Sequence, residues 1–212
     1  MIDNTWLVKN TRKVTLPDDS LMYQHKQGQK VSSDNENFNR LIMERFSLCP
    51  NKPRRVLELG IGSGINSIML KKHFPNWFIT GIEIDEEQAE LATYNSILQD
   101  LEIEVITGDL REFNNNEKYD LIIANPPYKK ELSGKQSPHH RRNIARFELT
   151  CNMSDIFSAI ERNISSNGQA WLLYSSERAE ELKNYITQGN FKEIDMIKKN
   201  NIIISGFKYV AN

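Results

Sequence analysis

The chain has 212 residues, of which 39% are hydrophobic and 26% are charged, and its formal net charge is −1. These values suit one globular unit with a full hydrophobic core and argue against a uniformly basic nucleic-acid binder. No run of about 18 apolar residues occurs, and the first residues lack the plan of a signal peptide, so we expect no membrane span. Cys49 and Cys151 stand far apart without neighbouring ligands. We therefore expect no disulfide, no metal site and a reducing, cytoplasmic location.

Two parts are expected along the chain, a leader over residues 1–50 and a larger domain over residues 51–212. In the leader, a short strand or hairpin over 21–28 precedes a helix over 35–48. From residue 54 onward, strand and helix patterns alternate, which is typical of a parallel α/β sheet. The expected strands cover 55–59, 77–83, 103–106, 119–124 and 169–174, and the helices cover 65–74, 86–98, 154–164 and 177–188. Gly168 is expected to end the third of these helices, and 191–197 with 202–209 predict a closing antiparallel pair.

The turn after the first strand of the larger domain contains Gly60, Gly62 and Gly64, and Glu58 precedes it. Glycine permits a tight turn and lets a ligand approach without obstruction from a Cβ atom. In nicotinamide enzymes the third glycine usually comes one residue later, and a pyrophosphate lies on the following helix. A carboxylate at the mouth of the loop disfavours a pyrophosphate and suits a cation. We therefore expect S-adenosylmethionine (SAM), whose sulfonium and α-amino groups are both positive.

Two further acidic residues end the next strands: Glu83 the second and Asp109 the third. The spacing in the sequence between Gly64 and Glu83 is close to that expected for a carboxylate that accepts hydrogen bonds from both ribose hydroxyls. Asp109, with Leu110 beside it, is placed to accept from the amino group of adenine. A single carboxylate at a strand end is often only a helix cap or a solvated turn residue. In series with the glycine turn, the two acids favour a nucleoside site.

The fourth strand runs into Asn125-Pro126-Pro127-Tyr128. Two prolines stop the strand, because neither can donate to a ladder, and they present a polar group at the carboxyl end of the sheet, where ligands bind. The Asn125 side-chain oxygen and the Pro126 carbonyl oxygen are suited to accept hydrogen bonds from the two N–H groups of a planar amine. The lone pair of the amine can then attack a methyl sulfonium. Tyr128 is suited to stack on the flat substrate. A plain strand-ending turn is the alternative interpretation of the tetrad.

Positive charge gathers directly after this tetrad. Residues 129–148 hold six basic and two acidic side chains, a net charge of +4. Such an asymmetry indicates a local contact with a polyanion, although a solvated loop is the commoner explanation of a charge run. The residues expected to contact the phosphates of such a polyanion are Lys129, Lys130, Arg141, Arg142 and Arg146.

Taken in order, these motifs resemble Rossmann-like SAM-dependent methyltransferases of the Asn-Pro-Pro-Tyr type, over about residues 55–174. The resemblance implies an α/β fold with a seven-stranded, mostly parallel sheet, one antiparallel strand near the C-terminus, and helices on both faces. It also implies a catalytic tetrad of Asn125, Pro126, Pro127 and Tyr128. The cofactor-binding residues that it implies are Glu58, Gly60, Gly62, Gly64, Glu83, Asp109, Leu110 and Asn125.

A narrower resemblance is to bacterial methyltransferases that modify adenine N6 in valine tRNA next to the anticodon. It rests on Gln24 and Gly28 followed by Ser33-Asp34, and on the Ala-Arg-x-Glu pattern of residues 145–148. It implies an adenine-N6 methyltransferase that acts on RNA, with tRNA as the expected partner. We expect a monomer or a weak homodimer.

Other functions stay open at this point. The same tetrad suits the amide nitrogen of a protein glutamine, as in methyltransferases that act on release factors, and it suits adenine in DNA. The usual Pro-Arg-x-Glu stretch of the release-factor enzymes is not found in residues 1–50. A nucleotide-binding module without catalysis is a further alternative, and the intact series of acids, glycines and Asn125 argues against it.

Overall fold

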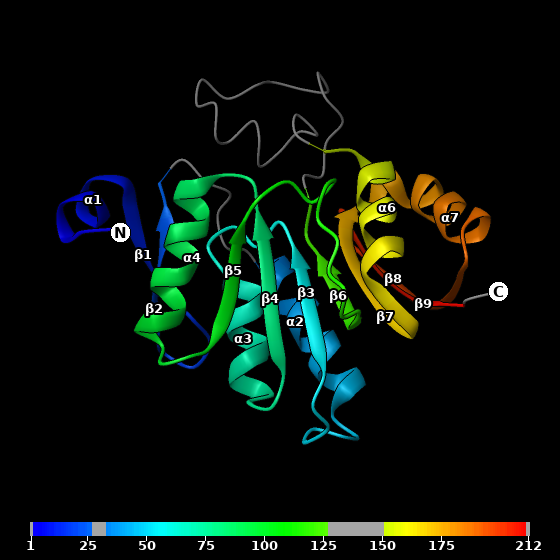
Figure 1. The fold of residues 1–212 in the computed structure, drawn as a ribbon, viewed down its shortest axis with the longest axis horizontal. Coiled ribbons are helices and arrows are strands. Elements are labelled where there is room, and N and C mark those ends of the chain that lie inside the picture. Colours follow the sequence, from blue (N-terminus) through cyan, green and yellow to red (C-terminus); the bar gives the residue numbers. More distant parts are fainter. Residues whose placement is uncertain (1, 27–32, 127–150, 211–212) are drawn as a thin grey trace.

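The computed structural model describes residues 2–26, 33–126 and 151–210, and its centre is a seven-stranded sheet with helices on both faces (Figure 1). The strands follow the order β5-β4-β3-β6-β7-β9-β8. Six strands run the same way, and β9 is antiparallel to both of its neighbours, β7 and β8. The predicted fold class is therefore confirmed. The strands are β3 (Arg55–Leu59), β4 (Phe78–Glu83), β5 (Ile103–Thr107), β6 (Tyr119–Ala124), β7 (Ile164–Ser175), β8 (Phe191–Lys199) and β9 (Ile202–Tyr209).

Five α-helices accompany this sheet within the described residues: α2 (Ser33–Phe46), α3 (Ile65–His73), α4 (Glu86–Leu98), α6 (Met153–Asn163) and α7 (Ala179–Gln188). A short 3-10 helix over Ser176–Arg178 precedes α7. Their predicted existence and order are confirmed, and Asp85 caps α4 by accepting from the N–H groups of Glu87 and Gln88. Among the described residues, no helix is long and apolar enough to cross a membrane.

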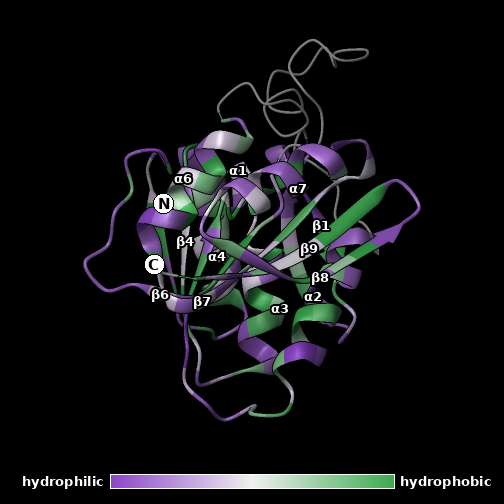
Figure 2. Ribbon diagram, turned by 90° about the vertical axis from the view of Figure 1, so that its right-hand side faces the viewer, coloured by the Kyte–Doolittle hydropathy of each residue, from purple (hydrophilic) through white to green (hydrophobic). Residues whose placement is uncertain are grey.

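The core forms two layers, one on each face of the sheet. Successive strand residues point to opposite faces, so Val56 packs with α2 and α3 while Leu57 packs with α6 and α7. Phe38 and Trp77 are among the largest fully buried side chains of the first layer. Figure 2 shows hydrophobic residues along the central strands and hydrophilic residues along most of the surrounding loops.

The described part of the leader forms a small unit beside α4 (Figure 1). Helix α1 (Asn4–Asn10) precedes a two-stranded antiparallel hairpin of β1 (Thr11–Thr15) and β2 (Leu21–His25). Leu16 and Met22 of this unit pack against Ile65 and Ile68 of α3. We expected a strand or hairpin in this region, but not α1 or β1. Helix α2 belongs to the core of the large sheet, and the division of the chain at residue 50 stays a prediction.

One boundary was predicted wrongly. Helix α6 ends at Asn163, and Gly168 lies inside β7, which begins at Ile164 rather than at residue 169. A Cβ atom at Gly168 would lie 2.6 Å from Ile164 Cγ1, and the neighbouring Asn167 has a φ of 68°. Gly168 is therefore explained by close approach within an irregular strand, not by the end of a helix.

Candidate cofactor and active site

The glycine turn and the Asn-Pro segment meet at the point where the strand order reverses. From β3 the chain proceeds to β4 and β5 on one side, and then returns to place β6 on the other side of β3. Strands β3 and β6 are parallel, with Leu59 opposite Ala124. In open α/β sheets, the crevice at the carboxyl ends of such a strand pair is where ligands bind. The structure thus brings together two motifs that are about 60 residues apart in the sequence.

The three glycines of the turn all have left-handed backbone conformations, with φ values of 72°, 57° and 87° for Gly60, Gly62 and Gly64. A Cβ atom at Gly60 or Gly62 would meet nothing within 4 Å, whereas one at Gly64 would lie 3.4 Å from the Ala92 Cβ of helix α4. The first two glycines therefore leave space open above the turn. Gly64 instead permits helix α4 to pack closely.

Glu58 differs from the expectation of a carboxylate at the mouth of the loop, because its side chain is buried beneath the turn and only 1% of the residue is exposed. One carboxylate oxygen accepts from Asn66 Nδ2 at 2.7 Å, and the other accepts from the backbone N–H of Ser67 at 3.1 Å and from its hydroxyl. The Asn66 side-chain oxygen in turn accepts from Asn39 Nδ2 of α2 at 2.9 Å. Glu58 thus ties the turn to the first residues of α3 and, through Asn66, to α2.

Burial raises the pKa of the Glu58 carboxyl to about 7, although the hydrogen bonds from Ser67 and Asn66 act in the opposite direction. A carboxyl group with such a pKa changes its charge near neutral pH. Ser67 and Asn66 were not among the predicted site residues. Their place in the first turn of the helix after the glycines was the signal that could have identified them.

Glu83 is the last residue of β4, and its side chain lies at the side of the glycine turn. Its carboxylate accepts from the backbone N–H of Gly62 at 2.9 Å and from that of Asp85 at 3.0 Å. Burial raises the pKa of this carboxyl, again against the effect of its hydrogen bonds. The side chain therefore links the second strand to the glycine turn at the carboxyl edge of the sheet.

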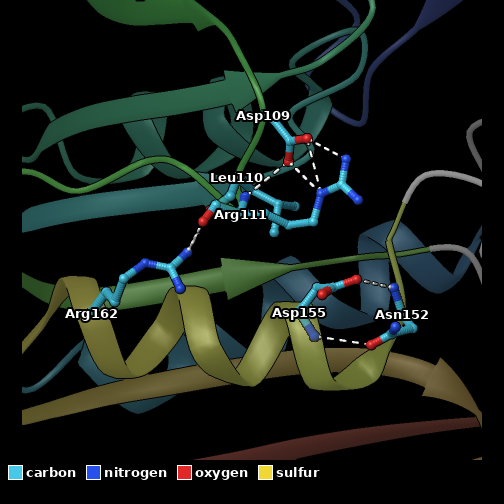
Figure 3. A network of polar contacts seen from close by, with 6 residues as sticks. All are labelled: Asp109, Leu110, Arg111, Asn152, Asp155 and Arg162. Carbon is cyan, nitrogen blue, oxygen red and sulfur yellow. Dashed lines mark hydrogen bonds and ion pairs between the residues drawn. The ribbon is translucent and has the colours of Figure 1, made fainter.

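Asp109 follows β5, and both of its carboxylate oxygens are engaged by Arg111 (Figure 3). Arg111 Nε lies 3.0 and 2.9 Å from the two oxygens, and the Arg111 N–H donates to one of them at 2.9 Å. This pairing holds the pKa of Asp109 below its usual value. Arg111 was not predicted, because the direction of its side chain follows from no periodicity in the sequence.

The loop that carries Asp109 is held from the opposite side by α6. Arg162 donates to the carbonyl oxygens of Leu110 at 2.9 Å and Arg111 at 2.8 Å (Figure 3). The Leu110 side chain packs against the hydrophobic layer that contains α6. Leu110 is therefore fixed through its backbone as well as its side chain.

Asn125 presents an unsatisfied acceptor at the end of β6. Its Oδ1 atom is buried and has no hydrogen-bond partner among the described residues. Leaving a buried polar atom unpaired costs about 1–3 kcal/mol, and such a cost at a ligand-binding edge indicates a function. Other orphaned atoms, such as Trp77 Nε1, also occur, so the place of Asn125 at the reversal of strand order is the decisive point.

Most of the remaining tetrad and all of the predicted RNA contacts lie outside the described residues. Pro126 is described and buried. The remaining predicted residues are Pro127, Tyr128, Lys129, Lys130, Arg141, Arg142 and Arg146. The described chain resumes at Cys151, and α6 begins two residues later, at Met153. Its capping box is formed by the Asn152 and Asp155 side chains, which accept from each other's backbone N–H groups (Figure 3).

Comparison with known proteins agrees with this geometry. The architecture is that of the Rossmann-like methyltransferases, and it is similar to a 16S rRNA N2 G1207 methyltransferase of T. thermophilus in complex with AdoMet and guanosine. The TM-score is 0.67, with 15% identity, over 95% of this chain and 50% of that one. The family model described as methyltransferase small domain matches residues 36–203, and the chain belongs to this family.

Two relatives with named activities are similar at the level of sequence. A tRNA1(Val) (adenine(37)-N6)-methyltransferase of Pedobacter heparinus is 27% identical over 134 residues, which is 62% of this chain and 56% of that protein. A release factor glutamine methyltransferase of Flavobacterium psychrophilum is 26% identical over 170 residues, which is 74% of this chain and 59% of that protein. The chain thus spans little more than half the length of these two relatives.

Proposed function

We propose that this protein transfers a methyl group from SAM to the exocyclic N6 amine of an adenine in RNA, with tRNA as the substrate. The observation that carries the proposal is the unpartnered, buried Oδ1 of Asn125 at the carboxyl end of β6, in register with the glycine turn after β3. An acceptor held in this way is prepared for a donor that arrives with the substrate.

The residues around the turn fit SAM as the cofactor. Gly60 and Gly62 leave space that a Cβ atom would fill, and Glu83 places a carboxylate beside that space, suited to the ribose hydroxyls. Asp109 and Leu110 lie on the next loop, suited to adenine, while Glu58 and Gly64 hold the turn and its helix in place. When bound, SAM supplies an electrophilic methyl group on a positive sulfur.

The protein's part in the reaction is to hold the amine. The lone pair of an adenine amine is delocalised into the ring, which makes the amine a poor nucleophile. Oδ1 of Asn125 and the carbonyl oxygen of Pro126 accept hydrogen bonds from the two N–H groups of the amine. These hydrogen bonds favour a pyramidal nitrogen and stabilise the positive charge that develops there. Pro127 and Tyr128 complete the tetrad, with the tyrosine ring stacked on the base. The proton then leaves to water, so no general base is required.

The choice of RNA rests on charge and on relatives. Lys129, Lys130, Arg141, Arg142 and Arg146 follow the tetrad directly and are proposed to neutralise phosphates while the adenine is extruded into the site. The relative from Pedobacter heparinus, named as an adenine-N6 methyltransferase of a tRNA, supports this choice. We also propose that the protein works in the cytoplasm, where tRNA is found, and that it is a monomer or a weak homodimer.

The direct test is methyl transfer from labelled SAM to bulk tRNA, followed by analysis of the nucleosides. We expect labelled N6-methyladenosine, and no label in the presence of S-adenosylhomocysteine. Absence of this nucleoside from tRNA, from total RNA and from DNA would contradict the proposal.

A second candidate is methylation of a glutamine amide in a release factor. The relative from Flavobacterium psychrophilum favours it, and the tetrad suits that planar nitrogen equally well. Offering a release factor and tRNA in parallel distinguishes the two, because label on protein would move the function to this second class. Label on adenine in DNA would instead indicate a DNA adenine-N6 methyltransferase.

A further inference from the structure

The side chain of Asn95 joins the amino-terminal hairpin to the glycine turn. Asn95 lies in α4 and is fully buried, with no exposed surface. Its Oδ1 accepts from the backbone N–H of Tyr23 at 2.8 Å, and its Nδ2 donates to the Tyr23 carbonyl at 2.8 Å and to the Ser63 carbonyl at 2.9 Å. One amide therefore connects three segments that are far apart in the sequence.

The contact with Tyr23 resembles the pairing of a strand with a neighbour. The Asn95 amide satisfies both the N–H and the C=O of one residue of β2, as a residue of an adjacent antiparallel strand would. The contact with Ser63 reaches the backbone between Gly62 and Gly64. A buried amide with all three of these bonds has no water to replace a lost partner, so the spacing between hairpin and turn is set by this side chain.

Helix α4 is a suitable support for such a link. Its Ala92 Cβ lies where a Cβ atom on Gly64 would approach to 3.4 Å, so the helix is packed directly on the turn. At its other end, Gln99 Nε2 donates to the Leu21 carbonyl at 2.6 Å, which ties the far end of β2 to the helix without touching the turn. Further contacts join the hairpin to α4, including the edge-on pair of the Tyr23 and Tyr94 rings and the approach of His25 Nε2 to the Glu87 carboxylate at 3.8 Å. Among these contacts, the one at Asn95 also includes the glycine turn.

We propose that Asn95 is a positioning residue that makes the amino-terminal hairpin part of the cofactor site, so that hairpin docking and SAM binding stabilise each other. The proposal rests on the proposed function, because SAM is the ligand of the turn. Coupling between two sites is reciprocal in free energy. A hairpin held by Asn95 keeps the turn in its binding conformation, and SAM bound at the turn must protect the hairpin from opening.

The first test compares Asn95→Asp with two matched variants. Asn95→Asp keeps the acceptor for Tyr23 but removes both donated bonds, and we expect the Kd for SAM, measured by calorimetry, to rise about 10-fold. Turnover at saturating SAM stays close to that of the wild type, because no contact with the substrate is lost. Ser96→Ala removes a neighbouring buried hydroxyl whose bond is to Thr93 of the same helix. Gln99→Ala removes an attachment of the hairpin to α4 that does not involve the glycine turn. Both are expected to leave the Kd unchanged; an Asn95→Asp protein that is folded and binds SAM as the wild type does would overturn the proposal.

The second test needs no variant. Hydrogen exchange of the wild-type protein is measured with and without SAM, and the amides of β2 are compared with those of β8, on the far edge of the sheet. We expect SAM to slow exchange in β2, and at Tyr23 above all, more than in β8. Bound SAM that leaves β2 exchange unchanged overturns this proposal alone, whereas a wild-type protein that binds no SAM overturns the proposed function and this proposal with it.

Discussion

At the scale of single residues, the direction of the Glu58 side chain decides its role. The sequence places a carboxylate just before the glycines, and we expected it at the mouth of the loop. Val56 and Glu58 are two residues apart in β3 and therefore share a face of the sheet, the face that α2 and α3 cover. Alternation along the strand could thus have predicted that the Glu58 side chain is buried. It could not have predicted the hydrogen bonds from Asn66 and Ser67, because these depend on how α3 packs.

The raised pKa of Glu58 predicts that its contribution to the free energy of unfolding depends on pH. Its pKa is about 7 in the folded protein, whereas an exposed glutamate has its ordinary pKa of 4.5. The folded state therefore binds the proton more tightly and loses stability as pH rises from 4.5 through 7. Glu58→Gln cannot ionise. The free energy of unfolding of the wild type relative to Glu58→Gln, measured in urea, is expected to fall by on the order of 1–3 kcal/mol between pH 4.5 and pH 8. Parallel pH curves for the two proteins would contradict this.

The open space above Gly62 predicts a loss of SAM binding in Gly62→Val. A Cβ atom there meets no protein atom within 4 Å, so the added side chain occupies the approach path of the ligand. The φ of 57° also imposes strain, which costs about 1–2 kcal/mol.

A control separates the two effects. Asn200→Val places the same side chain at a φ of 52°, in the turn between β8 and β9. We expect similar losses of melting temperature in both variants, but calorimetric SAM binding only in Asn200→Val. SAM binding by Gly62→Val at wild-type affinity would show that the space is not the cofactor's.

At the scale of elements, predictions succeeded where periodicity is strong. The parallel strands are short apolar runs, and α2, α3 and α4 have clear caps or breakers, so their existence and order followed from the sequence. Helix α1 has only seven residues, and β1 reads Thr-Arg-Lys-Val-Thr with one aliphatic side chain, so neither has a distinctive pattern. Strand β1 pairs with β2, and β2 is in turn bonded to Asn95 of α4.

The capping box of α6 predicts a modest role in stability. Asn152 accepts from the backbone N–H of Asp155 at 3.0 Å, and Asn152→Ala removes this bond at an exposed position. We expect a loss of about 1 kcal/mol in the free energy of unfolding. Ser154→Ala, at an exposed site in the first turn of the same helix, is the control and is expected to change little. Equal stability of both variants in urea would show that the box does not hold the helix start.

At the scale of the whole molecule, the fold brings its chemistry to one edge. The glycine turn, Glu83, Asp109 and Asn125 all follow parallel strands, so a sequence that orders them along the chain also gathers them in space. This arrangement was predictable from strand order alone. The pairing of Asp109 with Arg111 and the link through Asn95 were not, because each depends on side-chain directions that no periodicity encodes.

The charge distribution predicts how RNA binding responds to salt. Arg141→Ala with Arg142→Ala removes two phosphate contacts, so we expect weaker RNA binding and a plot of log affinity against log salt that is shallower by about 2. Lys198→Ala with Lys199→Ala removes two exposed charges from the β8 end and is expected to leave the slope unchanged. The same slope in both double variants, measured by fluorescence anisotropy, would mean that Arg141 and Arg142 are only solvated.

The most direct test of the central claim measures the rate of a single methyl transfer and the affinity for SAM in the same Asn125→Ala protein. In the wild type, the side-chain oxygen of Asn125 is proposed to act on the amine as the amine reacts. We therefore expect the single-turnover rate constant of Asn125→Ala at saturating SAM to be about 100-fold lower. The Kd for SAM should change by no more than about twofold, and Asn125→Asp, which keeps an acceptor, should retain more activity. An unchanged rate constant in Asn125→Ala would contradict the account.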